Sequence, residues 1–279
     1  MYDTIQALGA TRIQHGKFND RIYVMKLAPA DLPDVVGQLE DLAVRQAYGK
    51  VIVKAPSRCV QAFADSGYAE EARIPGFFNG REDVHFLVRY HDRDRQVERK
   101  PEVVEKNLAI AREKQASGEP PRRPQWGDAE VARATEADVE AMSEVYREVF
   151  PSYPFPIHDP GYLRQCMRED VEFFKVVRDG RLVALSSAEM MPADGNAEMT
   201  DFATLPELRG QGAAQGLLTA MEAAMAERRM PTVFTIARAY STGMNVTFAK
   251  SGYAYGGTLT GNTNIGGDVE SMNVWYKRL

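Results

Sequence analysis

The sequence has few of the residues that form cross-links or metal sites. Its 279 residues include 2 cysteines, Cys59 and Cys166, which are too few for a disulfide framework or a structural zinc site. The 4 histidines show no spacing typical of metal ligands, so we expect no bound metal. No apolar run approaches the roughly 18 residues of a membrane-spanning helix, and the first residues lack the pattern of a secretory signal. We therefore expect a cytoplasmic protein without a membrane partner.

Positive charge is scarce as well. The 34 lysines and arginines are outnumbered by 39 aspartates and glutamates, which gives a formal net charge of -5 and a pI near 5.6. A protein that binds nucleic acid needs a basic face to neutralise phosphates, so we expect no nucleic-acid partner. An acidic enzyme can still attract a cationic amine.

The most informative feature is a glycine-rich turn made of Arg209, Gly210, Gln211, Gly212, Ala213 and Ala214. Residues 198–205 predict a strand before it, and apolar residues at helical spacing from Leu217 onward predict a helix after it. Glycines leave backbone N–H groups unshielded, and the first N–H groups of a helix have no partners within that helix. The turn is therefore a candidate phosphate site, and a pyrophosphate is the favoured ligand.

Other phosphate-binding motifs fit this turn less well. A nucleoside-triphosphate loop requires Lys-Ser or Lys-Thr after its second glycine, and neither follows here. A dinucleotide-binding turn requires a third glycine, but Gln215 stands in its place. A glycine-rich connection without a ligand is the remaining alternative.

A second unusual segment is rich in proline and aromatic residues. Residues 150–156 contain three prolines and three aromatic side chains, among them Tyr153. Proline fixes φ and removes a backbone donor, so this segment is predicted to be a stiff loop and not a helix or an interior strand. Its composition by itself indicates a rigid connector.

The glycine-rich turn and its flanks resemble the acetyl-CoA loop of the GNAT N-acetyltransferases. Downstream come a predicted strand (232–237), a helix (241–250) and the pair Gly252-Tyr253, as in that superfamily. Three segments narrow the resemblance to the β-lysine N-acetyltransferases, and it extends over nearly the whole chain. These segments are residues 152–157, residues 200–206 and the tail at residues 235–277.

The resemblance implies a fold, a co-substrate and a reaction. The fold is a mixed α/β, three-layer α+β acyl-CoA N-acyltransferase fold, and the co-substrate is acetyl-CoA. The reaction transfers an acetyl group to the N6 amine of β-lysine, the product of lysine 2,3-aminomutase, and gives the compatible solute N6-acetyl-β-lysine. A homodimer is an open alternative to a monomer.

An internal repeat suggests how the rest of the chain is organised. Residues 63–69 and 248–254 are identical at six of seven positions. The counterpart of the phosphate turn, residues 28–33, has no glycine, so the first copy lacks a phosphate site. Residues that break helices and strands cluster at 116–124 and indicate a boundary there. We predict a degenerate half-acetyltransferase domain with a linker helix (1–125) and a catalytic domain (126–279), with chance similarity as the alternative.

Acetyl transfer to an amine needs a group that accepts the ammonium proton and a source of a proton for the departing thiolate. Glu198 is the favoured base. Asp201, which a regular strand would place on the opposite face, is the alternative base or a ligand of the substrate ammonium. Many superfamily members carry a tyrosine acid where this chain has Phe248, so Tyr240, Ser241 or a water is expected to serve instead.

The remaining candidates bind the two substrates. The cofactor-binding residues that the resemblance implies are Phe202, Ala203, Thr204, Arg209, Gly210, Gln211, Gly212, Ala213, Ala214, Asn245 and Phe248. The candidates for acceptor binding are Tyr153, Glu189, Arg238, Asn262, Asn264 and Glu270. Glu189 is also a third candidate base, and the two asparagines could be plain turn formers.

Two other functions remain open at this point. The chain could acetylate another small amine, such as a polyamine, lysine or an aminoglycoside. It could also be a non-catalytic acyl-CoA-binding module, which the missing tyrosine at position 248 would allow.

Overall fold

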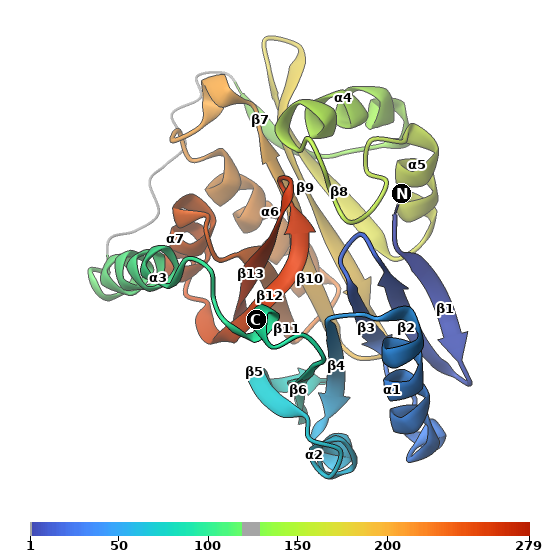
Figure 1. Ribbon diagram of the computed structural model, residues 1–279. Helices are drawn as coiled ribbons and strands as arrows, with labels where there is room; N and C mark the ends of the chain where they lie inside the picture. Colours follow the sequence, from blue (N-terminus) through green and yellow to red (C-terminus); the bar gives the residue numbers. More distant parts are fainter. Residues whose placement is uncertain (1, 119–128) are drawn as a thin grey trace.

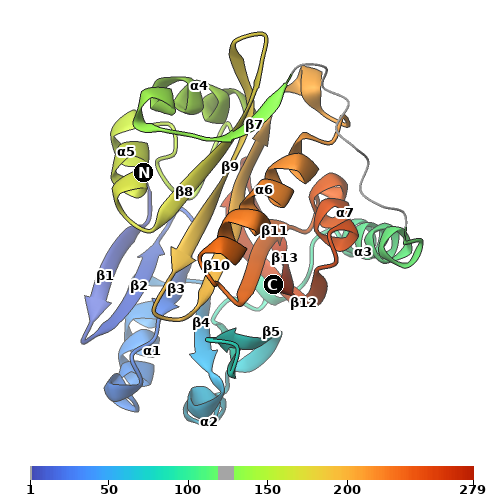
Figure 2. The ribbon, with the colours of Figure 1, turned by 180° about the vertical axis from the view of Figure 1, so that it is seen from behind.

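The computed structural model describes residues 2–118 and 129–279, which form one strongly curved 13-stranded sheet with helices on its faces (Figures 1 and 2). The strands are β1 (Thr4–Leu8), β2 (Thr11–Gly16), β3 (Arg21–Lys26), β4 (Lys50–Pro56), β5 (Ala69–Phe78), β6 (Glu82–Tyr90), β7 (Glu130–Arg133), β8 (Val171–Arg178), β9 (Arg181–Met191), β10 (Asn196–Thr204), β11 (Thr232–Arg238), β12 (Ala254–Ile265) and β13 (Asp268–Arg278). The α-helices are α1 (Asp34–Gln46), α2 (Val60–Ala64), α3 (Pro101–Ala116), α4 (Val139–Val149), α5 (Pro160–Arg168), α6 (Ala213–Glu227) and α7 (Thr242–Lys250). None of the helices in this described part is long and apolar enough to cross a membrane.

The same strand order occurs twice in the sheet. The full order is β1-β2-β3-β4-β6-β5-β12-β13-β11-β10-β9-β8-β7, so β1-β2-β3-β4-β6-β5 corresponds to β8-β9-β10-β11-β13-β12. The parallel pairs β3–β4 and β10–β11 hold equivalent positions, and α1 and α6 are their crossover helices. This symmetry supports the interpretation of the sequence repeat. The domain division stays a prediction, because its boundary near residue 125 lies outside the described residues.

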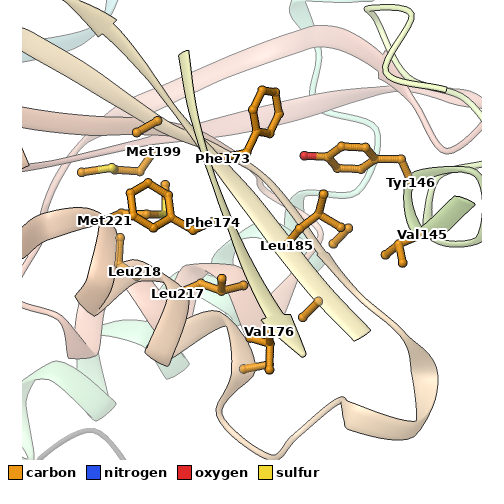
Figure 3. Packing of buried hydrophobic residues seen from close by; sticks show 14 of the residues in the cluster. Val145, Tyr146, Phe173, Phe174, Val176, Leu185, Met199, Leu217, Leu218 and Met221 are labelled. Carbon is orange, nitrogen blue, oxygen red and sulfur yellow. The ribbon is translucent and has the colours of Figure 1, made fainter. Parts of the chain in front are cut away.

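Helices cover both faces of the sheet in the C-terminal half (residues 129–279), as the three-layer prediction requires. Figure 3 shows Leu217, Leu218 and Met221 of α6 near Phe174, while Tyr146 of α4 lies near Phe173, its neighbour in β8. Successive strand residues face opposite sides, so the two phenylalanines contact different helical layers. A capping box precedes α4, where the Asp138 carboxylate accepts hydrogen bonds from the N–H and the hydroxyl of Thr135.

In the N-terminal half (residues 2–118), the strands pack over the face on which α4 lies, whereas α3 packs against α7. Apolar residues of both halves meet there in a buried cluster, here called the junction core: Ile52, Phe86 and Val88 from the first half with Phe234, Leu259 and Val274 from the second. The sheet curves enough for hairpins distant in strand order to touch, since Asn79 N–H donates to the Asp194 carbonyl at 2.6 Å. The two halves therefore enclose a shared interior.

The halves join edge to edge through β5 and β12. At the pairing of Gly257 with Ala72 the backbones approach so closely that a Cβ on Gly257 would lie 2.1 Å from the Glu71 carbonyl oxygen. Gly257 also has a φ of +142°, a conformation that residues with side chains rarely adopt. Glycine is therefore required where the two half-sheets meet.

A break in β12 exposes three consecutive carbonyls to the N-terminal half. The pairing of β12 with β13 is interrupted between Leu259 and Thr263. Three buried, positively charged side chains of the N-terminal half donate hydrogen bonds to the carbonyls that this interruption leaves unpaired. The bonds join Lys50 to Thr260, Arg95 to Gly261 and Arg21 to Asn262, at 2.7, 2.8 and 2.6 Å. Buried carbonyls need such partners, so the first half completes the hydrogen bonding of the second.

Candidate active site

A cavity of about 860 Å³ opens where β10 and β11 diverge. The two strands pair in parallel only at residues 196–198 and 232–234, and beyond that they separate. Of the predicted cofactor-binding residues, those that line the cavity are Phe202, Thr204, Arg209, Gly210, Gly212, Ala213, Ala214 and Phe248. Ala203, Gln211 and Asn245 do not line it. The described residues that form its walls also include parts of β11 and α7.

The glycine-rich turn has the geometry of an anion site. Gly210 and Gly212 have φ values of +76° and +87°, in the left-handed region that glycine adopts without strain. Gly212 is the N-cap of α6 and has no side chain to cover the first N–H groups of the helix. Arg209, Lys114 and Lys250 also line the cavity and add positive charge. Lys114 comes from α3 in the N-terminal half, and sequence reasoning missed it.

The side chain of Asp201 does not take the direction that a regular strand would give it. The register of β10 against β9 shifts between Thr200 and Ala203, and Asp201 lies in this bulge with a φ of +55°. Its carboxylate accepts hydrogen bonds from the Ser187 hydroxyl, at 2.6 Å, and from the Tyr153 hydroxyl. Ser187 lies on the same face as Glu198, so the expectation that Asp201 and Glu198 point to opposite faces is wrong. Both Asp201 and Tyr153 line the cavity.

Glu189, Glu198 and Asp201 form an acidic cluster next to this bulge. Glu189 and Glu198 are directly opposed across β9 and β10, so their side chains share a face. Burial raises the pKa of Glu198 to about 7; Lys54 and a hydrogen bond from Ile236 N–H oppose this shift, and Asp201 adds to it. Burial, Asp201 and Glu198 raise the pKa of Glu189 well above its ordinary value. Burial also raises the pKa of Asp201, against its hydrogen bonds.

Two residues of the N-terminal half face this acidic cluster, and sequence reasoning missed both. Lys54 of β4 and Tyr23 of β3 lie together, with the Lys54 ammonium 5.5 Å from the Tyr23 ring centroid. Burial would lower the pKa of Lys54, but Tyr23, Glu198 and Glu189 raise it above its ordinary value. The signal in the sequence was a lysine within the apolar run Val51–Ala55.

Arg238 and Glu270, two of the predicted acceptor residues, bind each other. Arg238 donates to both carboxylate oxygens of Glu270, at 2.9 and 2.6 Å, and Arg238 lines the cavity while Glu270 is buried behind it. Arg238 is therefore a positively charged group in the cavity wall, and Glu270 orients its guanidinium.

Four other predicted residues serve contacts away from the cavity. Asn262 and Asn264 hold the tip of β12 against the N-terminal half, where Asn264 donates to the Phe18 carbonyl at 2.9 Å. Asn245 is buried, and its side-chain oxygen accepts from Trp275 Nε1 at 2.9 Å. The Tyr240 hydroxyl donates to Glu98 at 2.6 Å. The roles assigned to these four residues from sequence remain predictions that the observed contacts do not favour.

Comparison with known proteins finds relatives that are acetyltransferases. The model of the acetyltransferase (GNAT) family matches residues 139–253. A β-lysine N(6)-acetyltransferase of Methanococcus maripaludis is 35% identical over 265 residues, 95% of each chain. Its counterpart in Methanosarcina mazei is 31% identical over 88% of this chain and 97% of its own. The N-acetyltransferase YodP of Bacillus subtilis is 32% identical over the full length of both chains. With such relatives over nearly its whole length, this chain belongs to the GNAT family and is an N-acetyltransferase that uses acetyl-CoA.

Proposed function

We propose that this enzyme acetylates the N6 amine of β-lysine and forms N6-acetyl-β-lysine. The observation that carries the proposal is the acidic cluster of Glu189, Glu198 and Asp201, of which Asp201 lines the cavity bordered by the glycine-rich turn. Such a cluster attracts a cationic amine to the place where the strands diverge. The names of the relatives from Methanococcus maripaludis and Methanosarcina mazei support β-lysine as that amine.

The cavity divides into a part for CoA and a part for the acceptor. We assign the pyrophosphate to the first N–H groups of α6, and the pantetheine arm to the unpaired backbone edges of β10 and β11. Acetyl-CoA supplies the activated thioester. The Tyr153 loop closes the acceptor side and orients Asp201 through the hydrogen bond between them.

The amine must lose a proton before it can attack. In water a lysine-like ammonium has a pKa near 10, so only roughly one molecule in a thousand is neutral at pH 7. We propose that Asp201 binds the ammonium, because Asp201 lines the cavity, and that Glu198 accepts the proton, because its pKa of about 7 suits a base at neutral pH. The nitrogen then bonds to the carbonyl carbon and releases a second proton as the C–S bond breaks, and the thiolate takes up a proton, so that one proton in total is set free.

The sequence predicted Tyr240, Ser241 or a water as the source of that last proton, and of the two residues it is Ser241 that lines the cavity. Phe248 lines the cavity and cannot donate, and Tyr240 does not line it. Of the described residues that line the cavity, Tyr153 is the one tyrosine. We therefore propose that Tyr153, or a water beside it, protonates the thiolate.

Thiol release from acetyl-CoA tests the proposed substrate. We expect the highest kcat/KM with β-lysine and lower values with α-lysine, spermidine and an aminoglycoside. A higher value with another amine would assign the enzyme to that substrate instead. CoA binding by calorimetry without thiol release from any amine would contradict the proposed catalysis.

The proposed reaction needs a supplier of β-lysine. Lysine 2,3-aminomutase makes this compound, so we propose that the two enzymes act in sequence in the cytoplasm. Heterologous expression of both should yield N6-acetyl-β-lysine, and expression of either alone should not.

A further inference from the structure

The placement of Lys54 calls for a chemical reason. Its neighbours in β4, Val53 and Ala55, are fully buried, and Lys54 shares a face with Ile52 of the junction core. A lysine in such a strand is costly unless its charge has a partner. The groups that stabilise the charged form of Lys54 are Tyr23 of its own half and Glu198 and Glu189 of the other half.

The repeat shows that this placement is systematic. Tyr23 pairs with Ile52 in the parallel pair of the first half, as Glu198 pairs with Phe234 in the parallel pair of the second. Tyr23 therefore stands at the position equivalent to Glu198, and both side chains point into the interior between the halves. The N-terminal half has no phosphate turn, but its residue at this position, Tyr23, still faces the acidic cluster.

The charges around this interior distinguish between kinds of amine. Three carboxyl groups and one ammonium converge there, from both halves of the chain. A polyamine carries only positive charges, so Lys54 would repel it. An amino acid would bring an ammonium for the carboxylates and a carboxylate for Lys54.

We propose that Lys54, supported by Tyr23, binds the carboxylate of the acceptor, so that the N-terminal half selects amino acids over simple diamines. This inference rests on the proposed function and adds a specificity determinant to it. The reactive amine then lies near Asp201 in the cavity, while the ammonium next to the substrate carboxylate contacts Glu189. The acceptor site is thus built from both copies of the repeat.

The test compares β-lysine with 1,4-diaminopentane, which is the same molecule without its carboxylate. In the wild-type enzyme we expect a strong preference for β-lysine. In Lys54→Met, which keeps an unbranched side chain but removes the charge, KM for β-lysine should rise about 100-fold while kcat/KM for the diamine stays the same or increases. Lys54→Arg should restore part of the preference.

A second variant and a control guard against a folding defect. Tyr23→Phe removes only the hydroxyl, and we expect it to raise KM for β-lysine severalfold without changing CoA affinity. The matched control is Lys26→Met, an exposed lysine of β3, which should leave the substrate ratio unchanged.

Two outcomes separate this inference from the proposed function. If Lys54→Met binds CoA normally and keeps the wild-type ratio between β-lysine and the diamine, the role of Lys54 is refuted while the proposed function stands. Equal losses with both substrates would likewise refute it and would make Lys54 a structural partner of Glu198. A wild-type enzyme that prefers the diamine would overturn the proposed substrate itself.

Discussion

Replacing Glu198 with glutamine should make the protein more stable at pH 8 while it abolishes most of the activity. Burial raises the pKa of this carboxyl from 4.5 to about 7. The folded state therefore holds the proton more tightly than the unfolded state, and the resulting stability is fully present below pH 4.5. It is lost as the pH rises to 7, above which the folded protein contains a buried charge.

The size of the effect follows from the shift in pKa. A difference between 4.5 and about 7 corresponds to roughly 3 kcal/mol above pH 7 and about 1 kcal/mol at pH 5. Glutamine does not ionise, and its side-chain oxygen can still accept the hydrogen bond from Ile236 N–H. Since roughly 2 °C of Tm accompanies each kcal/mol in a protein of this size, Glu198→Gln should raise Tm by about 6 °C at pH 8 and about 2 °C at pH 5.

Thermal unfolding followed by circular dichroism at both pH values measures this difference. Glu105→Gln, at an exposed position of α3, is the control and should change Tm little at either pH. We expect kcat of Glu198→Gln to fall about 100-fold or more. An equal change in Tm at pH 5 and pH 8 would refute the reasoning, because it would show that Glu198 titrates in its ordinary range and has no special fitness as a base.

Two further substitutions probe the phosphate turn and the joint between the halves. Gly212→Asp places a carboxylate beside the first N–H groups of α6 and should weaken CoA binding about 100-fold, as measured by calorimetry. The control is Gly180→Asp, at another glycine with positive φ, which should leave CoA affinity unchanged. Equal CoA affinities of the two variants would show that the turn is not part of the CoA site. Gly257→Ala should lower the free energy of unfolding by ~3 kcal/mol in urea titrations, because its Cβ would collide with the Glu71 carbonyl. Gly37→Ala in α1 meets no atom within 4 Å and is the control, and an unchanged urea midpoint for Gly257→Ala would contradict the close approach.

The part of the site that could be predicted from sequence is the part with local causes. Glycines at 210 and 212 set the turn, and the helical spacing after them sets α6, so the CoA loop follows from a few adjacent residues. The direction of Asp201 could not be predicted in this way. It depends on a bulge that arises only when β10 pairs with β9.

The errors on the acceptor side have the same origin. Lys54 and Tyr23 approach the acidic cluster only because the sheet curves until strands far apart in its order face each other, which no local pattern encodes. Asn262 and Asn264 looked like ligands for a substrate, yet the Asn264 side chain donates to the N-terminal half and the Asn262 side chain donates to Thr263 beside it. Long-range pairing therefore decides which polar residues are free to meet a substrate.

The three carbonyls of residues 260–262, held by cations of the other half, have a consequence for how the protein can be divided. Cut away from residues 2–118, the acetyltransferase half would expose those carbonyls and lose Lys54 at the same time. The two halves are thus joined like the subunits of a dimer, and we expect residues 129–279 expressed alone to be less stable than the whole chain.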